Sequence, residues 1–157
     1  MKKILLTQGK FALVDNEDFE YLNQWKWGFD NGYARRTVNY RKPCGKRTMA
    51  TVFMHRLILC VDGKNLVDHV DGDGLNNQKN NLRLCNHSQN ARNQKAKRIS
   101  MSGFKGVHLH NGRWCARIMV DNKRVHLGYF NEREQAAKAY NAAAKKHFGE
   151  FARINQL

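Results

Sequence analysis

The sequence predicts an α+β protein built from three consecutive parts. Short segments with strand-like alternation and turn residues fill residues 1–56. A strand, a polar loop, a second strand and a helix follow within residues 66–97, and three strands with an alanine-rich helix follow within residues 106–147. We therefore expect a small β-rich module, a central β-β-α unit and a three-stranded antiparallel sheet packed on one helix. The predicted domains span residues 1–50, 51–98 and 103–157.

In the N-terminal part, Gln8-Gly9-Lys10 predicts a turn between two short strands. Asp15 opens a polar stretch that is typical of a helix start, so a short helix is expected to run to Leu22. Residues 32–40 and 48–59 are expected to form two strands, joined by a hairpin-like connection around Pro43.

The central part is predicted to contain strands over residues 66–70 and 81–85, on either side of a polar loop. Residues 87–97 are polar, basic and free of Gly and Pro, which favours a helix.

The C-terminal part is predicted from its turns. His110-Asn111-Gly112 contains the Asn-Gly pair that is typical of hairpins. Asn131, with Glu134 three residues later, indicates an N-cap for a helix that ends before Gly149. The expected strands are residues 106–109, 113–120 and 124–130, and the expected helix is 132–147.

The charge of the chain points to a polyanionic partner. Lys and Arg exceed Asp and Glu by 28 − 13 = 15. No acidic residue lies between Asp30 and Asp62, or between Asp73 and Asp121. Long stretches of one sign are relieved by binding a polyanion, and the interleaved aromatic residues favour nucleic acid over an anionic membrane. No apolar run is long enough for a membrane span or a secretory signal, so we expect an intracellular protein with reduced cysteines. A zinc site made from scattered cysteines stays an alternative.

Asp68, His69 and Asn90 together carry the chemistry of phosphodiester hydrolysis. A neutral imidazole can accept the proton of an attacking water near pH 7. A hard divalent cation can neutralise the phosphate, and it prefers carboxylate and amide oxygens as ligands. Neighbouring strand residues point to opposite faces, so Asp68 and His69 share a site only at a bent strand end. Gly72 and Gly74 place such an end nearby.

This pattern resembles the HNH nucleases of the ββα-metal fold, in the His-Asn-Asn variant of phage and intron homing endonucleases. The matching residues are Asp68-His69, Asn81 before Leu82-Arg83-Leu84, and Asn90, with the upstream segment 55–59. The resemblance covers about residues 50–97. It implies His69 as general base, Asp68 and Asn90 as metal ligands, and Asn81 as the catalytic residue that braces the metal loop and orients His69.

Several alternatives stay open around this motif. Asn86, His87 and Asn93 lie near the same helix face as Asn90, so any of them can complete the metal site. Asp68 and Asp71 can instead hold calcium structurally, although the Glu of an EF-hand loop is absent. The expected cofactor is one divalent ion per active site, Mg²⁺ with Mn²⁺ as a substitute.

The C-terminal part resembles a second family, the Apetala-two/ethylene-response-factor DNA-binding domain. Four segments match in order, namely residues 104–107, 112–118, 127–130 and 136–141. The resemblance implies that the three-stranded sheet lies in the DNA major groove. The implied DNA contacts here are Lys105, His108, Arg113, Trp114, Arg117, Lys123 and Arg124, and basic residues of the central part add Arg83, Arg92 and Lys95. Strand alternation leaves Trp114 open to a core position instead.

Together these features predict a homing-type, metal-dependent DNA endonuclease that leaves a 5′-phosphate and a 3′-hydroxyl. Its expected partner is double-stranded DNA, bound by a monomer or a homodimer in the cytoplasm of a bacterial or phage-infected cell. A non-catalytic, sequence-specific DNA-binding regulator is the alternative, and an RNA-directed protein is a third reading.

Overall fold

The computed structural model describes residues 1–63, 65–94 and 101–157. The described chain contains several small β-sheets and four α-helices, which confirms the mixed α and β composition. It divides into two compact units, Met1–Asn86 and His87–Leu157. The boundary therefore falls inside the range 51–98 that the sequence predicts as one domain.

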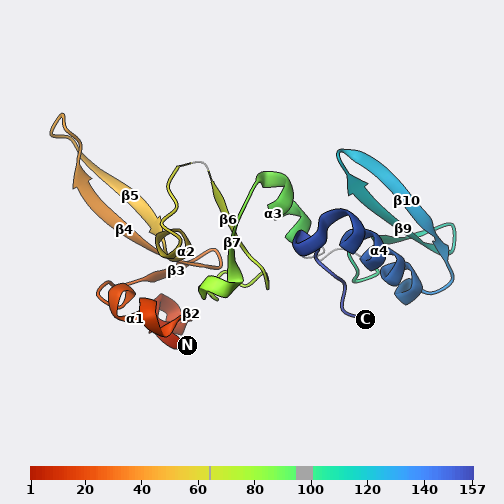
Figure 1. Ribbon diagram of the computed structural model, residues 1–157, viewed down its shortest axis with the longest axis horizontal. Helices are drawn as coiled ribbons and strands as arrows, with labels where there is room; N and C mark the ends of the chain where they lie inside the picture. Colours follow the sequence, from red (N-terminus) through yellow and green to blue (C-terminus); the bar gives the residue numbers. More distant parts are fainter. Residues whose placement is uncertain (64, 95–100) are drawn as a thin grey trace. The chain divides into compact units, whose positions relative to one another are not determined.

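The N-terminal unit contains three small sheets (Figure 1). Strands β1 and β2 form an antiparallel pair, β3, β4 and β5 form a sheet in that order, and β6 pairs antiparallel with β7. The strands are β1 (Lys2–Leu5), β2 (Phe11–Val14), β3 (Gly28–Asp30), β4 (Tyr33–Arg41), β5 (Arg47–Phe53), β6 (Leu66–His69) and β7 (Leu82–Cys85). The helical elements are η1 (Thr7–Gly9), α1 (Asn16–Leu22), α2 (Met54–Ile58) and η2 (Lys79–Asn81).

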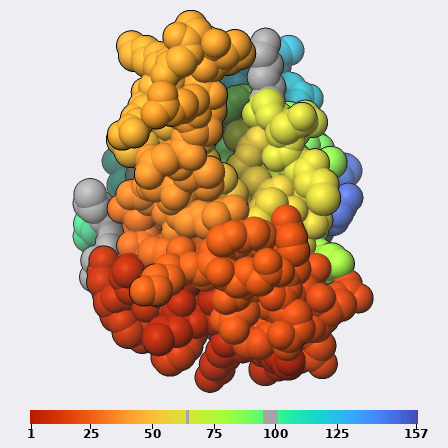
Figure 2. All heavy atoms as spheres, turned by 90° about the vertical axis from the view of Figure 1, so that its left-hand side faces the viewer, coloured from red at the N-terminus to blue at the C-terminus, as the bar shows by residue number. Residues whose placement is uncertain are grey.

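One hydrophobic cluster holds this unit together. Alternate residues of β1 and β2, such as Ile4 and Val14, point to the same side of the ribbon and are buried with Leu22 of α1, Trp27 and Met54. Figure 2 turns this unit toward the viewer, with the hairpin β4–β5 in orange extending away from the red N-terminal residues. The hairpin beyond the cluster is mostly exposed.

The predicted strand over residues 48–59 is wrong in its second half. β5 ends at Phe53, and Met54–Ile58 form the helix α2. Met54 is fully buried, and Leu57 and Ile58 pack against the same cluster. Their spacing of three and four residues suits one face of a helix, and a strand would have placed Leu57 and Ile58 on opposite sides.

The polar loop between β6 and β7 is attached to the rest of the unit by backbone contacts. Leu13 of β2 donates to the carbonyl of Leu75 and accepts from the amide of Asn77, both at 2.8 Å. Gly74 lies so close to the β3–β4 turn that an added Cβ would sit 2.4 Å from the carbonyl oxygen of Gly32. Only glycine fits this approach. The loop is therefore a packed part of the unit.

The C-terminal unit is a three-stranded antiparallel sheet, in the order β10-β9-β8, with helix α4 packed on one face (Figure 1). Small residues of α4, such as Ala136 and Ala144, are fully buried and let the helix lie close to Ala116 and Ile118 of β9. The elements are α3 (His87–Asn93), β8 (Val107–His110), β9 (Arg113–Val120), β10 (Lys123–Phe130), α4 (Arg133–Phe148) and η3 (Gly149–Phe151).

The three strands and the Gly149 stop of α4 confirm the prediction, whereas the start of the helix does not. Asn131 is not the N-cap, because Glu132 occupies that position and makes no side-chain cap bond. Glu134 instead pairs with Arg133 at 2.7 Å. The predicted helix over residues 87–97 is described only as far as Asn93.

Two further expectations concern the state of the cysteines and membrane-spanning segments. All four cysteines are free thiols. None of the helices in the described ranges is both long and apolar enough to span a bilayer.

Candidate functional site

Asp68 and His69 lie at the end of β6, opposite Arg83 and Leu82 of β7. Both side chains are buried, with 6% and 5% of their surface exposed. The chain turns directly after them, and the amide of Gly72 donates to the carbonyl of His69 at 2.9 Å. The two residues therefore stand at the end of the strand, directly before a turn of the chain.

The side chain of Asn81 holds the loop that follows. Its carbonyl oxygen accepts from the backbone amide of Asp71 at 3.0 Å, and its amide donates to the Asp71 carboxylate and the Asn76 carbonyl at 3.0 and 2.8 Å. Burial acts to raise the pKa of Asp71, but hydrogen bonds from the Asp73 amide, Asn76 and Asn81 outweigh it and lower the pKa. The loop is thus organised around a carboxylate that stays ionised.

His69 is buried against residues of other elements of the N-terminal unit. Its Nε2 is 3.4 Å from Oδ1 of Asn77, which is fully buried. Its ring is 5.2 Å from that of His55 and 5.9 Å from that of Tyr33, measured between centroids. Burial lowers the pKa of His69, although Asn77 and Asp71 oppose the shift. The imidazole is therefore neutral near pH 7, the state in which it can accept a proton.

His55 is a neighbour of His69 for which the sequence gives no role. It comes from α2 and stacks on Phe53 with ring centroids 5.5 Å apart. Burial, followed by the charges of His69 and Arg56, lowers its pKa to about 4. Its Nδ1 is buried and finds no hydrogen-bond partner among the described residues. Only its place at the head of the segment 55–59 could have drawn attention to it.

Asp68 forms an ion pair with Arg83 on the neighbouring strand. The Nε and Nη2 atoms of Arg83 donate to the same carboxylate oxygen, at 2.9 and 2.7 Å. Both side chains are largely buried. Arg83, which the sequence assigns to DNA binding, therefore contacts a predicted metal ligand in the free protein.

The implied donor set suits a magnesium ion better than zinc. It offers the Asp68 carboxylate and the Asn90 amide oxygen, and Asn90 lies half-buried on α3 in the C-terminal unit. Among the described residues, no three His, Cys, Asp or Glu side chains are grouped to hold a metal. Mg²⁺ is commonly held by one or two carboxylates together with water and substrate phosphate, so a carboxylate and an amide oxygen are chemically suited to this ion.

The face of the C-terminal sheet away from α4 carries a cluster of basic and aromatic side chains. Nε of Arg117 donates to Nδ1 of His108 at 3.2 Å, and Sγ of Cys115 is 3.4 Å from Nδ1 of His126. These residues line a cavity of about 210 Å³. Strand register places the following residues on this outer face: His108, His110, Arg113, Cys115, Arg117, Arg124, His126 and Tyr129.

Other predicted contact residues lie elsewhere. Trp114 packs against the buried cluster on the α4 side of the sheet. Lys105 is half-buried against α3, and Arg92 lies on α3 itself. Lys123 is exposed at the β9–β10 turn. Lys95 is outside the described residues.

The buried state of His55 predicts a pH-dependent stability. Its folded pKa of about 4 is below its ordinary 6.5, so between these values the unfolded chain binds a proton that the folded protein excludes. The free energy of unfolding should therefore fall as pH drops from 6.5 to 5, by roughly 1.5 kcal/mol from this group. In urea unfolding, the free energy of unfolding of His55→Phe should fall less steeply with decreasing pH, whereas the exposed His147→Phe should match the unsubstituted protein. The same pH dependence in all three proteins would contradict this assignment.

Comparison with known proteins finds one relative that matches nearly the whole chain and others that match part of it. No family model matches the chain. It is 30% identical over 157 residues to an uncharacterized HNH endonuclease of Acanthamoeba polyphaga mimivirus, covering 96% of this chain and 77% of that relative.

Plant proteins match a shorter part of this chain. The chain is 39% identical over 69 residues to an AP2/ERF and B3 domain-containing transcription repressor of Arabidopsis thaliana, and 47% identical over 53 residues to an ethylene-responsive transcription factor of the same plant. These alignments cover 43% and 31% of this chain but only 19% and 12% of the relatives. The similarity to AP2/ERF proteins is thus confined to part of each chain, while the near full-length match shows that this chain belongs to the HNH endonuclease family.

Proposed function

We propose that this protein is a metal-dependent DNA endonuclease of the homing type. The observation that carries the proposal is a buried, neutral His69 beside the Asp68 carboxylate at the end of β6. In this assignment β6, β7 and α3 form the cutting part, as in the ββα-metal arrangement, and the sheet β8–β10 binds duplex DNA.

His69 acts as the general base. Its neutral imidazole takes a proton from a water molecule, and the oxygen of that water forms a bond to phosphorus. The bond from phosphorus to the 3′ oxygen breaks, so the products are a 5′-phosphate and a 3′-hydroxyl. Asp68 and Asn90 would hold a divalent ion, with Mg²⁺ the best fit, which would supply charge neutralisation at the phosphate and at the leaving oxygen. Asn81 keeps the loop beside His69 in place through its three hydrogen bonds.

Arg83 would have different partners in the free and the DNA-bound protein. In the free protein its guanidinium neutralises Asp68. With a cation on Asp68, the Arg83 guanidinium would be available to pair with a DNA phosphate, which guanidinium groups bind strongly. Such an exchange of partners is consistent with the Asp68–Arg83 ion pair in the structure and with the contact to DNA that the sequence predicts for Arg83.

The outer face of the C-terminal sheet provides the DNA-binding surface. Arg113, Arg117 and Arg124 supply charges for phosphates or guanine edges, and no acidic side chain of the three strands opposes them. A single catalytic histidine per chain cuts one strand per engagement. A double-strand break therefore needs a homodimer or a second encounter by the monomer.

A DNA-binding regulator without catalysis is the second candidate. The Asp68–Arg83 pair favours it, because it occupies the carboxylate that the reaction requires. Nicking of a supercoiled plasmid with Mg²⁺, abolished by a chelator, would establish the nuclease. Binding without nicking under any divalent ion would favour the regulator.

Removal of the imidazole should separate cutting from binding. His69→Ala is expected to reduce the nicking rate at saturating DNA by at least about 100-fold, since general-base catalysis contributes on this scale. DNA affinity, measured by fluorescence anisotropy, should stay within about twofold because the sheet carries binding. His147→Ala, at an exposed position, is the control. A parallel loss of affinity in His69→Ala would refute this division of roles.

The Asp68–Arg83 pair should dominate stability at this site. Asp68→Ala in metal-free buffer is expected to lower the free energy of unfolding by about 3 kcal/mol, because a largely buried guanidinium loses its counter-charge. Adding Arg83→Met should recover part of that loss. The more exposed pair Asp30–Arg35 is the control, and Asp30→Ala should cost under about 1 kcal/mol. If the double variant were as unstable as Asp68→Ala alone, another interaction would be responsible.

Charge on the sheet should set the salt dependence of binding. Arg124→Ala, on the outer face, is expected to weaken DNA binding and lower the slope of log Kd against log salt by about 0.9, the value for one phosphate contact. Lys138→Ala makes a comparable charge change on the exposed side of α4 and should leave the slope intact. Titrations from 50 to 200 mM salt measure this, and identical slopes for both variants would exclude the sheet as the binding face.

A further inference from the structure

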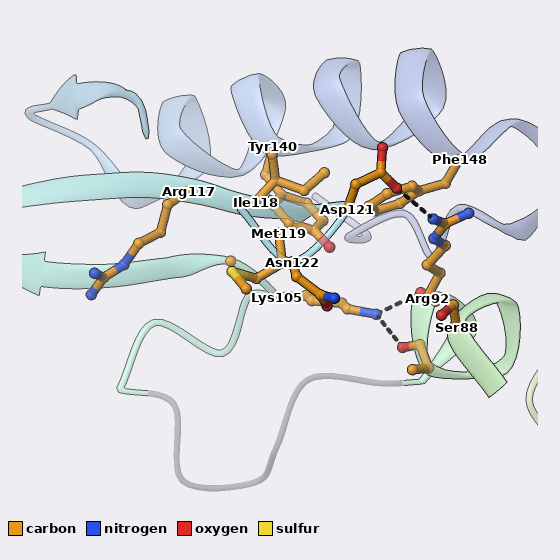
Figure 3. Close-up of a pocket in the computed structure, with 12 residues that line it drawn as sticks. Ser88, Arg92, Lys105, Arg117, Ile118, Met119, Asp121, Asn122, Tyr140 and Phe148 are labelled. Carbon is orange, nitrogen blue, oxygen red and sulfur yellow. Dashed lines mark hydrogen bonds and ion pairs between the residues drawn. The ribbon is translucent and has the colours of Figure 1, made fainter. Parts of the chain in front are cut away.

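The Lys105 side chain ends at the C-terminus of α3. Its ammonium group donates to the carbonyl oxygens of Arg92 and Gln94 at 2.6 and 2.7 Å, and a third carbonyl, that of Ala91, lies at 3.5 Å. Figure 3 shows the side chain reaching from the turn before β8 toward the end of α3. The last carbonyls of a helix have no partner within the helix, and a cation there also meets the negative end of the helix dipole.

The backbone of Lys105 is fixed from the opposite side. Its amide donates to Oδ1 of Asn155 at 2.7 Å, and Nδ2 of Asn155 donates back to its carbonyl at 3.1 Å. Asn155 in turn exchanges two hydrogen bonds with the side chain of Asn141 on α4, at 2.8 and 2.9 Å. A continuous chain of hydrogen bonds thus links α4 through Asn155 and Lys105 to the end of α3.

Arg92 adds a second attachment of α3 to the same unit. Its guanidinium lies 4.7 Å from the centroid of the Phe148 ring at the end of α4. It is also 3.7 Å from the carboxylate of Asp121 in the β9–β10 turn. Figure 3 shows Arg92 and Lys105 on neighbouring sides of a cavity of about 580 Å³ between α3 and the sheet.

This geometry is a poor match to a DNA contact. The three donors of the Lys105 ammonium are directed at three backbone carbonyls, and burial lowers its pKa to about 8. Moving the side chain to a phosphate would leave the end of α3 without these bonds. By contrast, Arg124 on the outer face is exposed.

We propose that Lys105 is a positioning residue that fixes α3, and with it Asn90, on the C-terminal unit and does not bind DNA. The inference rests on the proposed function in so far as Asn90 is a metal ligand. The same unit would then carry the DNA-binding sheet and hold the helix that completes the metal site. Correct placement of Asn90 would depend on the hydrogen bonds that begin at Asn141.

The test uses the full chain with Lys105→Met, which keeps an unbranched apolar side chain and removes the donors. Hydrogen–deuterium exchange, without metal or DNA, should be about tenfold faster for the α3 amides and unchanged for β9. Lys105→Arg, which retains charge and donors, should restore most of the protection. Lys138→Met, on the exposed side of α4, should behave like the unsubstituted protein.

Two further measurements separate positioning from DNA contact. For Lys105→Met, the Mg²⁺ concentration giving half-maximal cleavage at saturating DNA should rise at least about fivefold, while metal-free DNA affinity stays within about twofold. Unchanged exchange in α3 would overturn the proposal. So would faster exchange with an unaltered Mg²⁺ requirement, or a tenfold loss of affinity with α3 still protected.

Failure of the proposed function would be recognised independently. If the unsubstituted protein did not cut DNA, the nuclease assignment would fall, whereas the exchange measurement would still report whether Lys105 holds α3.

Discussion

The hydrogen bonds of the Asn81 side chain are the constraint on which the candidate site depends. The loop between β6 and β7 is rich in Asp, Asn and Gly, a composition that by itself favours turns open to solvent. Asn81 ties Asp71 and Asn76 together. Asp15 binds the far end of the loop, accepting from Gln78 and from the Lys79 amide at 3.0 and 2.8 Å. These bonds hold the loop in one conformation beside His69. The loop thereby helps to bury the imidazole, and this burial lowers its pKa.

Charge balance explains why the site can be stable before DNA arrives. An isolated buried carboxylate is costly, and Asp68 avoids that cost through Arg83. His55 and His69 avoid a similar cost by remaining neutral. In the free protein the buried Asp68 carboxylate is therefore paired and the two buried histidines are uncharged. In the proposed reaction, DNA would bring new negative charge, which a divalent cation and the Arg83 guanidinium would neutralise.

The C-terminal unit uses similar residues for two different purposes. Arginines on the outer sheet face remain accessible to a polyanion, which suits an excess of 15 positive charges. Lys105 and Arg92 instead face inward and attach α3 to α4 and the β9–β10 turn. A basic residue in a DNA-binding unit is thus not by its type a DNA contact. The surrounding residues determine whether its charged group is accessible to DNA or is bonded to other groups of the protein.

Much of the local structure is encoded in short segments. The Asn111-Gly112 turn adopts positive φ at both residues, as a tight hairpin requires, so the three strands of the C-terminal sheet could be placed from sequence. The stop of α4 at Gly149 follows from its left-handed φ of 53°. The helix α2 could not be recognised, because five apolar-rich residues fit a strand or a helix until the cluster around Met54 selects one.

For the site, the sequence by itself determined which chemical groups are present: a carboxylate, an imidazole and amides at the spacing of the HNH family. It also determined the net positive charge, which favours binding to a polyanion. Only the tertiary structure decided that His55 and Tyr33 enclose His69, that Arg83 neutralises Asp68, and that Lys105 turns toward α3. The physical reason is that these contacts join residues far apart in the chain. Their formation depends on how separate elements pack, which local spacing does not encode.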